Sequence, residues 1–261
     1  MTGMMEFDEE AVRRVEMAYT TPDIVEQRAG VIAALALGSG ERVLDVGVGP
    51  GFLAAEIAAV VGPGGRVCGI DLSADMLAVA ARRDPGTDAA AVELELAGAE
   101  AIPYTDGSFD AVVSTQVLEY VPDIPAALAE IHRVLRPGGR VLVLDTDWDS
   151  LVWATPDEEV MARVLVAWRE HLADPYLPRT LRRALTAAGF AVDRPSVVPL
   201  LNVGTPEQSF SGILLGLVAT FVKGRNGLDA TTVEAWEDSM RGLGDDWFFS
   251  LNRYVFTATR T

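Results

Sequence analysis

The chain has 261 residues, and its 49% hydrophobic content can fill the core of one large α/β domain or of two small ones. Its 38 Asp and Glu residues outnumber its 21 Lys and Arg residues, so the formal net charge is -17. A chain this acidic has little basic surface for nucleic-acid phosphates or for an anionic membrane, and we expect neither partner.

Cysteine usage and the N-terminal sequence indicate the compartment. Cys68 is the only cysteine, which excludes an intrachain disulfide and a metal cluster built on cysteines. The first ten residues, MTGMMEFDEE, form no apolar run like that of a signal peptide, and no run approaches the ~18 apolar residues that span a bilayer. We therefore expect a cytoplasmic protein, monomeric or homodimeric. Lys223 is the only lysine, which suggests a GC-rich bacterial genome.

Strand-like and helix-like segments alternate in the first half of the chain. Five short segments, apolar or alternating and bounded by turn residues, are predicted as strands: ERVLDVG (41–47), RVCGID (66–71), AVELELA (91–97), SFDAVVST (108–115) and RVLVLDT (140–146). Helices are predicted around them, over about 9–37, 52–61, 73–84 and 123–135. This alternation is typical of a doubly wound parallel sheet.

The pattern changes after Asp147. Helices are predicted over 157–171 and 178–188, and two further strands over FAVDRPSVVPL (190–200) and FSLNRYVFTATR (249–260). The fifty residues between those strands contain two more helical segments, SGILLGLVATFV and ATTVEAWEDSMRGL. We therefore expect an α/β fold with a seven-stranded, mostly parallel sheet and a helical cap inserted near the C-terminus.

The segment VLDVGVGPG places Gly47, Gly49 and Gly51 between a buried strand and a helix. A dinucleotide loop has the spacing G-x-G-x-x-G and brings backbone amides to a pyrophosphate. Here Asp45 precedes the glycines, which is unfavourable beside a pyrophosphate but suits an ammonium group. The helix N-terminus near Phe52 offers free N–H groups and suits a carboxylate. Ammonium and carboxylate together describe an amino acid, and a nucleoside joined to an amino acid is S-adenosylmethionine.

Four motifs then carry a resemblance to a known family. VLDVGVGPG, GIDLS, IPYTDGSFDAVVSTQVLEYVPD and EIHRVLRPGGRVLVLD, in this order, resemble those of the class I S-adenosylmethionine-dependent methyltransferases, in the subgroup related to ubiquinone and menaquinone methyltransferases. The similarity covers about residues 19–147. It implies a Rossmann-like fold with three parts: an N-terminal helical lid (1–38), an S-adenosylmethionine-binding core (39–147), and the rest of the core (148–261) with a substrate-covering helical insertion at about 204–245.

The resemblance also implies roles for individual residues. The methionine end of the cofactor would be lined by Asp45, Gly47, Gly49 and Gly51, bordered by Thr115 and Gln116, and paired through its carboxylate with Arg28. At the nucleoside end, Asp71 would accept hydrogen bonds from the ribose hydroxyls. Leu72 and Met76 would pack against adenine, and backbone amides near Ala99 and Glu100 would contact the edge of the ring. Simpler readings stay open: Asp45 as a strand-end cap, and Thr115 and Gln116 as a solvated strand end.

The chain departs from its relatives in the adenine motif. Gly98 stands where relatives often have Asp, so the usual side-chain acceptor for the adenine amino group is missing, and Glu100 is the candidate substitute. Val48 stands where relatives often have Cys, which changes little.

Two other groups of residues need an interpretation. Asp145, Asp147 and Asp149 alternate and suit Mg²⁺ if extended, but no further ligand is obvious, so we expect no metal and place them at the rim of the substrate pocket. Tyr19 and His171 are the candidates for a base that removes a proton from the methyl acceptor. For His171 the alternative is a helix C-terminal histidine stabilised by the helix dipole.

The predicted function is S-adenosylmethionine-dependent transfer of a methyl group to an O, N or C atom of a small, hydrophobic or aromatic molecule. The alternative is a cofactor-binding protein of the same fold that transfers no methyl group, acting as a cyclase or a binding module. A short-chain oxidoreductase is disfavoured because it needs Tyr-x-x-x-Lys, whereas Ala219 stands four residues before Lys223. A nucleic-acid methyltransferase is disfavoured by charge and by the lack of an Asn/Asp-Pro-Pro-aromatic motif.

Overall fold

The computed structural model describes residues 9–204 and 209–261, with side chains from residue 14 on. The helices are α1 (Glu9–Tyr19), α2 (Pro22–Leu35), α3 (Phe52–Val61), α4 (Ala74–Ala80), α5 (Ile124–Val134), α6 (Glu158–Trp168), α7 (Pro178–Ala187), α8 (Phe210–Val222) and α9 (Ala230–Arg241). The strands are β1 (Arg42–Val46), β2 (Arg66–Asp71), β3 (Val92–Leu96), β4 (Phe109–Thr115), β5 (Leu135–Thr146), β6 (Val152–Trp153), β7 (Phe190–Val192), β8 (Ser196–Val203) and β9 (Phe248–Arg260).

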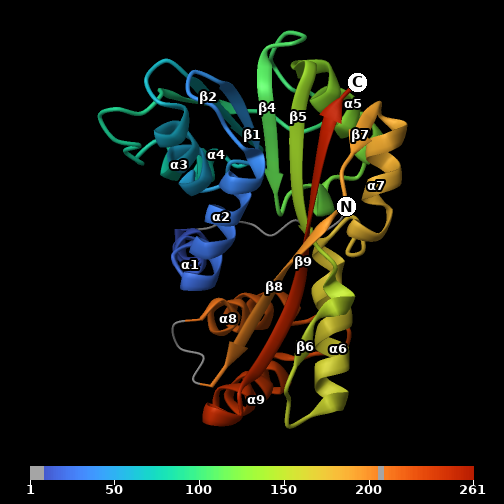
Figure 1. Ribbon diagram of the computed structural model, residues 1–261. Helices are drawn as coiled ribbons and strands as arrows, with labels where there is room; N and C mark the ends of the chain where they lie inside the picture. The colour runs from blue at the N-terminus through green and yellow to red at the C-terminus, as the bar shows by residue number, and fades with distance from the viewer. Residues whose placement is uncertain (1–8, 205–208) are drawn as a thin grey trace.

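One sheet runs through the molecule in the order β3-β2-β1-β4-β5-β9-β6, and β7 and β8 also pair with β9 (Figure 1). Strands β1 to β5 are parallel to one another, and β9 is antiparallel to each of its partners, β5 included. The order reverses between β1 and β4, which is where an open parallel sheet offers a crevice at the carboxyl ends of its strands. The predicted α/β class and the mostly parallel sheet are confirmed.

Helices cover both faces of the parallel part of the sheet. Helices α5 and α7 bury Leu128, Ile131 and Leu181 on one face, and helices α2 and α3 bury Val31 and Ile57 on the other. Because both faces are covered, the strands need apolar side chains in both directions, as the run at residues 41–47 predicts.

The antiparallel half differs in detail from the prediction. The segment 190–200 forms two strands, β7 and β8, because Pro195 has no N–H to donate and interrupts the pairing with β9. The short β6 was not predicted and pairs with the start of β9. Strand β9 is 13 residues long, so it extends beyond the parallel strands into the second half of the molecule.

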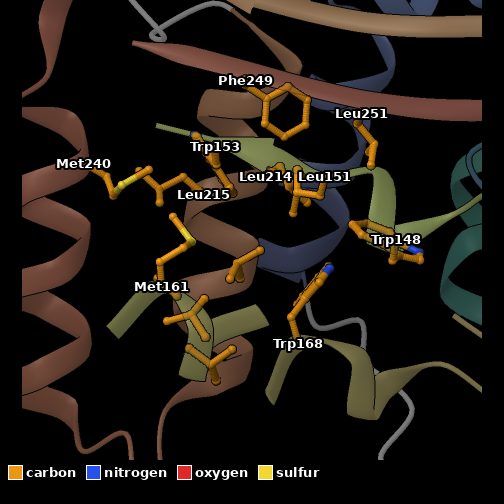
Figure 2. Packing of buried hydrophobic residues seen from close by; sticks show 14 of the residues in the cluster. Trp148, Leu151, Trp153, Met161, Trp168, Leu214, Leu215, Met240, Phe249 and Leu251 are labelled. Carbon is orange, nitrogen blue, oxygen red and sulfur yellow. The ribbon is translucent and has the colours of Figure 1, made fainter. Parts of the chain in front are cut away.

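That extension supports a second packed region, which we call the aromatic lobe. It is defined by the buried cluster of α6, α8 and α9 against β6, β8 and the first half of β9, and it includes Trp148, Trp153, Trp168, Trp236 and Trp247. Figure 2 labels the first three of these tryptophans. Helix α8, apolar on nearly all sides, lies at its centre and also contacts α1. The lobe lies beyond the carboxyl ends of the parallel strands (Figure 1).

In the described part of the chain, none of the helices combines the length and apolar character needed to cross a membrane.

Candidate active site

The glycine loop between β1 and α3 is tied to the end of β2. Gly47, Gly49 and Gly51 all have positive φ angles, of 73°, 51° and 79°. The Gly49 N–H donates to Asp71 Oδ2 at 2.9 Å, and the Ser73 N–H donates to Oδ1 of the same carboxylate at 2.9 Å. A carboxylate has about four lone-pair sites, so Asp71 keeps acceptor capacity for two hydroxyl groups.

Two of the three glycines also allow close approach. A Cβ atom on Gly47 would lie 2.1 Å from Val117 Cγ2, and one on Gly51 would lie 2.8 Å from Ala80 Cβ. At Gly49 the corresponding atom would meet only the Tyr19 hydroxyl, at 3.9 Å. Gly47 and Gly51 are therefore needed for packing, whereas Gly49 faces the open side of the loop.

Asp45 lies under this loop with only 2% of its surface exposed. Burial, and secondly the negative charge of Asp71, raise the pKa of Asp45 to about 7. A buried carboxyl group in this position favours a cationic partner. An ammonium group bound beside Asp45 would relieve the cost of ionising it.

Cofactor affinity should therefore depend on pH through Asp45. Because the pKa of Asp45 is about 7 in the free protein, the carboxyl must lose a proton before it pairs with an ammonium group. We expect affinity for S-adenosylmethionine to rise about tenfold per pH unit below pH 7 and to level off above it. Calorimetric titration from pH 5.5 to 8.5 measures this. Asp45→Asn should bind weakly with a flat profile, and a flat profile in the wild-type protein would contradict the assignment.

The predicted adenine-side residues separate into two groups. Leu72 is 65% exposed, and a Cβ on Gly98 would lie 3.4 Å from Leu72 Cδ2 and 3.6 Å from Glu100 Oε2. These three residues therefore lie together beside Asp71, with an acidic group next to the position where relatives often have Asp. Ala99 and Met76 are buried, Met76 in a small cluster with Val79.

Arg28 has protein partners of its own. Its guanidinium lies 2.9 Å from the Glu56 carboxylate and donates to the Tyr19 carbonyl oxygen. It also lies 5.0 Å from the centre of the Phe52 ring. Arg28 therefore joins the end of α1 to the first two turns of α3, beside the position predicted for the cofactor carboxylate.

Tyr19 ends α1 over the glycine loop. Its ring stacks on Phe52 at 5.9 Å. Burial raises the pKa of the Tyr19 hydroxyl, although Arg253 opposes the shift. Tyr19 therefore keeps its proton at neutral pH, so its hydroxyl can donate a hydrogen bond. An ion pair of 2.8 Å between Glu16 and Arg83 also holds α1 in place.

Thr115 and Gln116 lie at the carboxyl end of β4, opposite this loop. Gln116 has a positive φ of 58°. Its N–H donates to the Leu144 carbonyl at 2.7 Å, and its Oε1 accepts from the Thr146 hydroxyl at 2.7 Å. Gln116 is therefore held in a sharp turn and is not a solvated strand end.

The expectation that residues 145–149 form a pocket rim is wrong for Asp145. Asp145 is fully buried and accepts from the Val117 N–H at 3.0 Å. Asp147 and Asp149 instead form ion pairs with Arg179, at 2.7 and 2.8 Å. The three carboxylates do not share one face because the strand ends at Thr146 and a 3-10 turn, η2 (Trp148–Ser150), follows. Within residues 9–204 and 209–261 no group of three or more acidic, His or Cys side chains is arranged to hold a metal ion.

Sequence reasoning missed two buried charged residues beside Asp145. Glu119, in the 3-10 turn η1 (Leu118–Tyr120), accepts from the Thr146 N–H at 3.1 Å and from Trp148 Nε1 at 3.3 Å. Arg253 of β9 is also buried and donates to Gln27 at 2.6 Å. The sequence signal that could have identified Glu119 is its position as the single acid in the segment QVLEYV, which follows the fourth strand.

His171 lies inside the aromatic lobe and is only 2% exposed. Its ring centre is 4.0 Å from that of Trp168 and 5.6 Å from that of Tyr120, and its Nδ1 pairs with the Trp168 carbonyl. Burial lowers the pKa of His171 to about 4, so the imidazole is neutral. Its Nε2 has no hydrogen-bond partner among the described residues.

These residues fit S-adenosylmethionine. Asp45 suits the ammonium group, the amino end of α3 suits the carboxylate, and Asp71 suits the ribose hydroxyls. Asp45 and the start of α3 lie at the carboxyl end of β1, where the strand order reverses, and Asp71 ends the neighbouring strand β2.

Comparison with known proteins agrees. Residues 44–143 match the family described as methyltransferase domain. The chain is 35% identical over 257 residues to a protein of Streptomyces fradiae described as an uncharacterized 37.1 kDa protein in transposon TN4556, covering 96% of this chain and 71% of the relative. It is 41% identical over 109 residues to a demethylmenaquinone methyltransferase of Symbiobacterium thermophilum, covering 41% of this chain and 43% of that protein.

The fold has counterparts among solved structures. Phosphoethanolamine N-methyltransferase 2 of Haemonchus contortus, in complex with S-adenosyl-L-methionine, superposes with a TM-score of 0.61 at 22% identity, covering 97% of this chain and 57% of that one. The matches to curated quinone methyltransferases span about half of their length. The chain belongs to the class I S-adenosylmethionine-dependent methyltransferases, in the subgroup resembling the ubiquinone and menaquinone methyltransferases, and S-adenosylmethionine is its cofactor.

Proposed function

We propose that this protein transfers the methyl group of S-adenosylmethionine to an O, N or C atom of a small, hydrophobic or aromatic molecule held against the aromatic lobe. The position of Tyr120 carries this proposal. Residues 117–120 begin with Val117, which lies against Gly47 of the glycine loop, and end at Tyr120, whose ring lies 5.6 Å from that of His171 in the lobe. One short segment thus joins the cofactor loop to an apolar surface suited to an aromatic acceptor.

The protein's own contribution is orientation and exclusion of water. The cofactor supplies a methyl group on a sulfonium, which is already a strong electrophile. Asp45 and Asp71 fix the two ends of the cofactor, and Tyr19, stacked on Phe52, covers the loop. The second half of the chain, including the helices of the 204–245 insertion, covers the acceptor. Holding the acceptor in line and away from water accounts for the rate enhancement without a nucleophilic residue.

We assign proton acceptance to His171 and orientation to Tyr19 for acceptors that must lose a proton. Nδ1 of His171 pairs with a backbone carbonyl, so its Nε2 carries the free lone pair. Tyr19 has a raised pKa and remains a donor. A base with a pKa of about 4 is weak, so its contribution lies at the low end of the usual range for general-base catalysis.

His171→Gln should therefore lower kcat by roughly 100-fold with a phenolic acceptor. Because the imidazole is neutral above about pH 4, the wild-type rate should show no acidic limb from His171 between pH 5 and 8. His132→Gln is the matched control. His132 packs against Phe190, on the face of the sheet that α5 and α7 cover, and not in the aromatic lobe. An unchanged kcat in His171→Gln, with only a lower melting temperature, would assign His171 to packing alone.

The first test of the function is release of S-adenosylhomocysteine with a panel of phenols, hydroquinones and amines. Acceptor-dependent release supports methyl transfer. Tight cofactor binding with no release from any member would favour the alternative, a protein that binds S-adenosylmethionine without transferring its methyl group.

A further inference from the structure

Two buried acids, Glu119 and Asp145, hold each other's backbone at the carboxyl ends of β4 and β5. The Asp145 carboxyl accepts from the backbone amides of Val117 and Glu119. The Glu119 carboxyl accepts from the amide of Thr146, the residue after Asp145, and from the Trp148 indole. This reciprocal arrangement places both carboxyl groups in one buried site, and both side chains are fully inaccessible to solvent.

Each acid uses only one of its oxygens in these contacts. Glu119 Oε1 and Asp145 Oδ2 are buried and have no hydrogen-bond partner among the residues that the structure describes. Two ionised carboxylates with unpartnered oxygens in one dry site would repel each other and would both lose hydration. A proton on one of them removes the repulsion between the two carboxylates.

The charges that face the pair compensate only one negative charge. Arg253 of β9 is the cation whose field reaches both acids. Tyr120 of η1 and Tyr19 of α1 are phenols with raised pKa values, so they add no charge at neutral pH. Arg253 also feels the negative charge of Asp23 of α2. Burial raises the pKa of Glu119 to about 7 and raises that of Asp145 as well.

We infer that Glu119 and Asp145 share a single proton and act as one positioning unit for the turn at Gln116 and Val117. That turn forms a wall of the cofactor loop, because Val117 fills the space beside Gly47 and Gln116 is held at a positive φ. Through Asp145, the acid pair fixes the Val117 amide and hence the position of this wall. The effect of the acid pair on cofactor affinity rests on the proposed function. The shared proton is independent of that proposal.

The proton is counted from the pH dependence of unfolding. In the unfolded chain both acids ionise above about pH 4.5, whereas the folded pair keeps one proton until about pH 7. The folding constant of the wild-type protein should therefore fall by one extra factor of ten per pH unit between pH 5 and 7. Asp45, whose pKa is also raised, contributes equally to every variant and cancels.

The variants are Asp145→Asn, Glu119→Gln and the double variant. Each amide keeps the carbonyl acceptor and supplies a permanent donor, so the fold should persist. If one proton is shared, the extra tenfold fall of the folding constant per pH unit should disappear in each of the three variants. The double variant should show no larger change in slope than either single variant. Asp147→Asn, whose carboxylate is part of an ion pair with Arg179, is the control and should keep the wild-type slope. The shared proton would be overturned if the single variants kept the wild-type pH dependence of the folding constant. It would also be overturned if the double variant lost two factors of ten per pH unit.

Positioning is tested by cofactor affinity. Asp145→Asn should bind S-adenosylmethionine within about twofold of wild type, because it still accepts from the Val117 amide. Asp145→Ala should bind roughly 10- to 100-fold more weakly, the loss expected for a hydrogen bond to a carboxyl group. Equal affinity in the two variants would overturn the positioning role. Failure of the wild-type protein itself to bind the cofactor would refute the proposed function and leave the proton count valid.

Discussion

Replacing Asp71 by alanine should lower affinity for S-adenosylmethionine by at least about 100-fold. Hydrogen bonds to a charged group contribute about 1.5–3 kcal/mol each, and Asp71 would lose two to the ribose. The variant also removes the acceptor for the Gly49 N–H, so the loop loses its link to β2. Calorimetric titration with S-adenosylmethionine and S-adenosylhomocysteine measures the loss, with NADH as a ligand that should not bind.

The control for Asp71→Ala is Asp75→Ala. Asp75 lies in the first turn of α4, carries the same charge and is exposed. It should retain wild-type affinity. Asp71→Asn should be intermediate, because the amide oxygen still accepts from Gly49 but carries no charge. Equal binding by Asp71→Ala and the wild-type protein would place the ribose elsewhere.

Gly47→Ala should be the most destabilising single substitution in the loop. The new Cβ would lie 2.1 Å from Val117 Cγ2, and the residue has a φ of 73°. The left-handed conformation costs about 1–2 kcal/mol and the overpacking about 1–3 kcal/mol, so we expect a loss of roughly 3 kcal/mol in the free energy of unfolding. Urea denaturation measures it.

Two further variants separate the steric clash with Val117 from the cost of placing alanine in the left-handed conformation. Gly49→Ala also has a positive φ, but its Cβ would meet only the Tyr19 hydroxyl at 3.9 Å, so it should lose only about 1–2 kcal/mol. Adding Val117→Ala to Gly47→Ala removes the clash and should recover the difference. A Gly47→Ala protein no less stable than Gly49→Ala would show that the loop does not pack against Val117.

The cofactor half of the protein was largely predictable from sequence because its determinants are local. Strand type follows from continuous apolar runs such as residues 41–47, and the glycine loop follows from its spacing and from Asp45 at the strand end. Asp71 falls at the end of the next strand, and in a parallel sheet those two ends must meet at one edge. The structure joins them through the Gly49–Asp71 hydrogen bond.

The rest was decided by tertiary contacts that join segments far apart in the chain. Asp145 reads as one of three alternating acids, and only the pairing of β5 with β4 and β9 buries it while leaving Asp147 to Arg179. The ion pair of Arg28 with Glu56 and the burial of Arg253 depend in the same way on how helices and strands pack. The sequence by itself determined the parallel half of the sheet, the glycine loop and the cofactor, because hydrophobic period and turn chemistry act over a few residues. Tertiary structure decided which charges are buried and paired, because desolvation depends on neighbours that the chain order does not reveal.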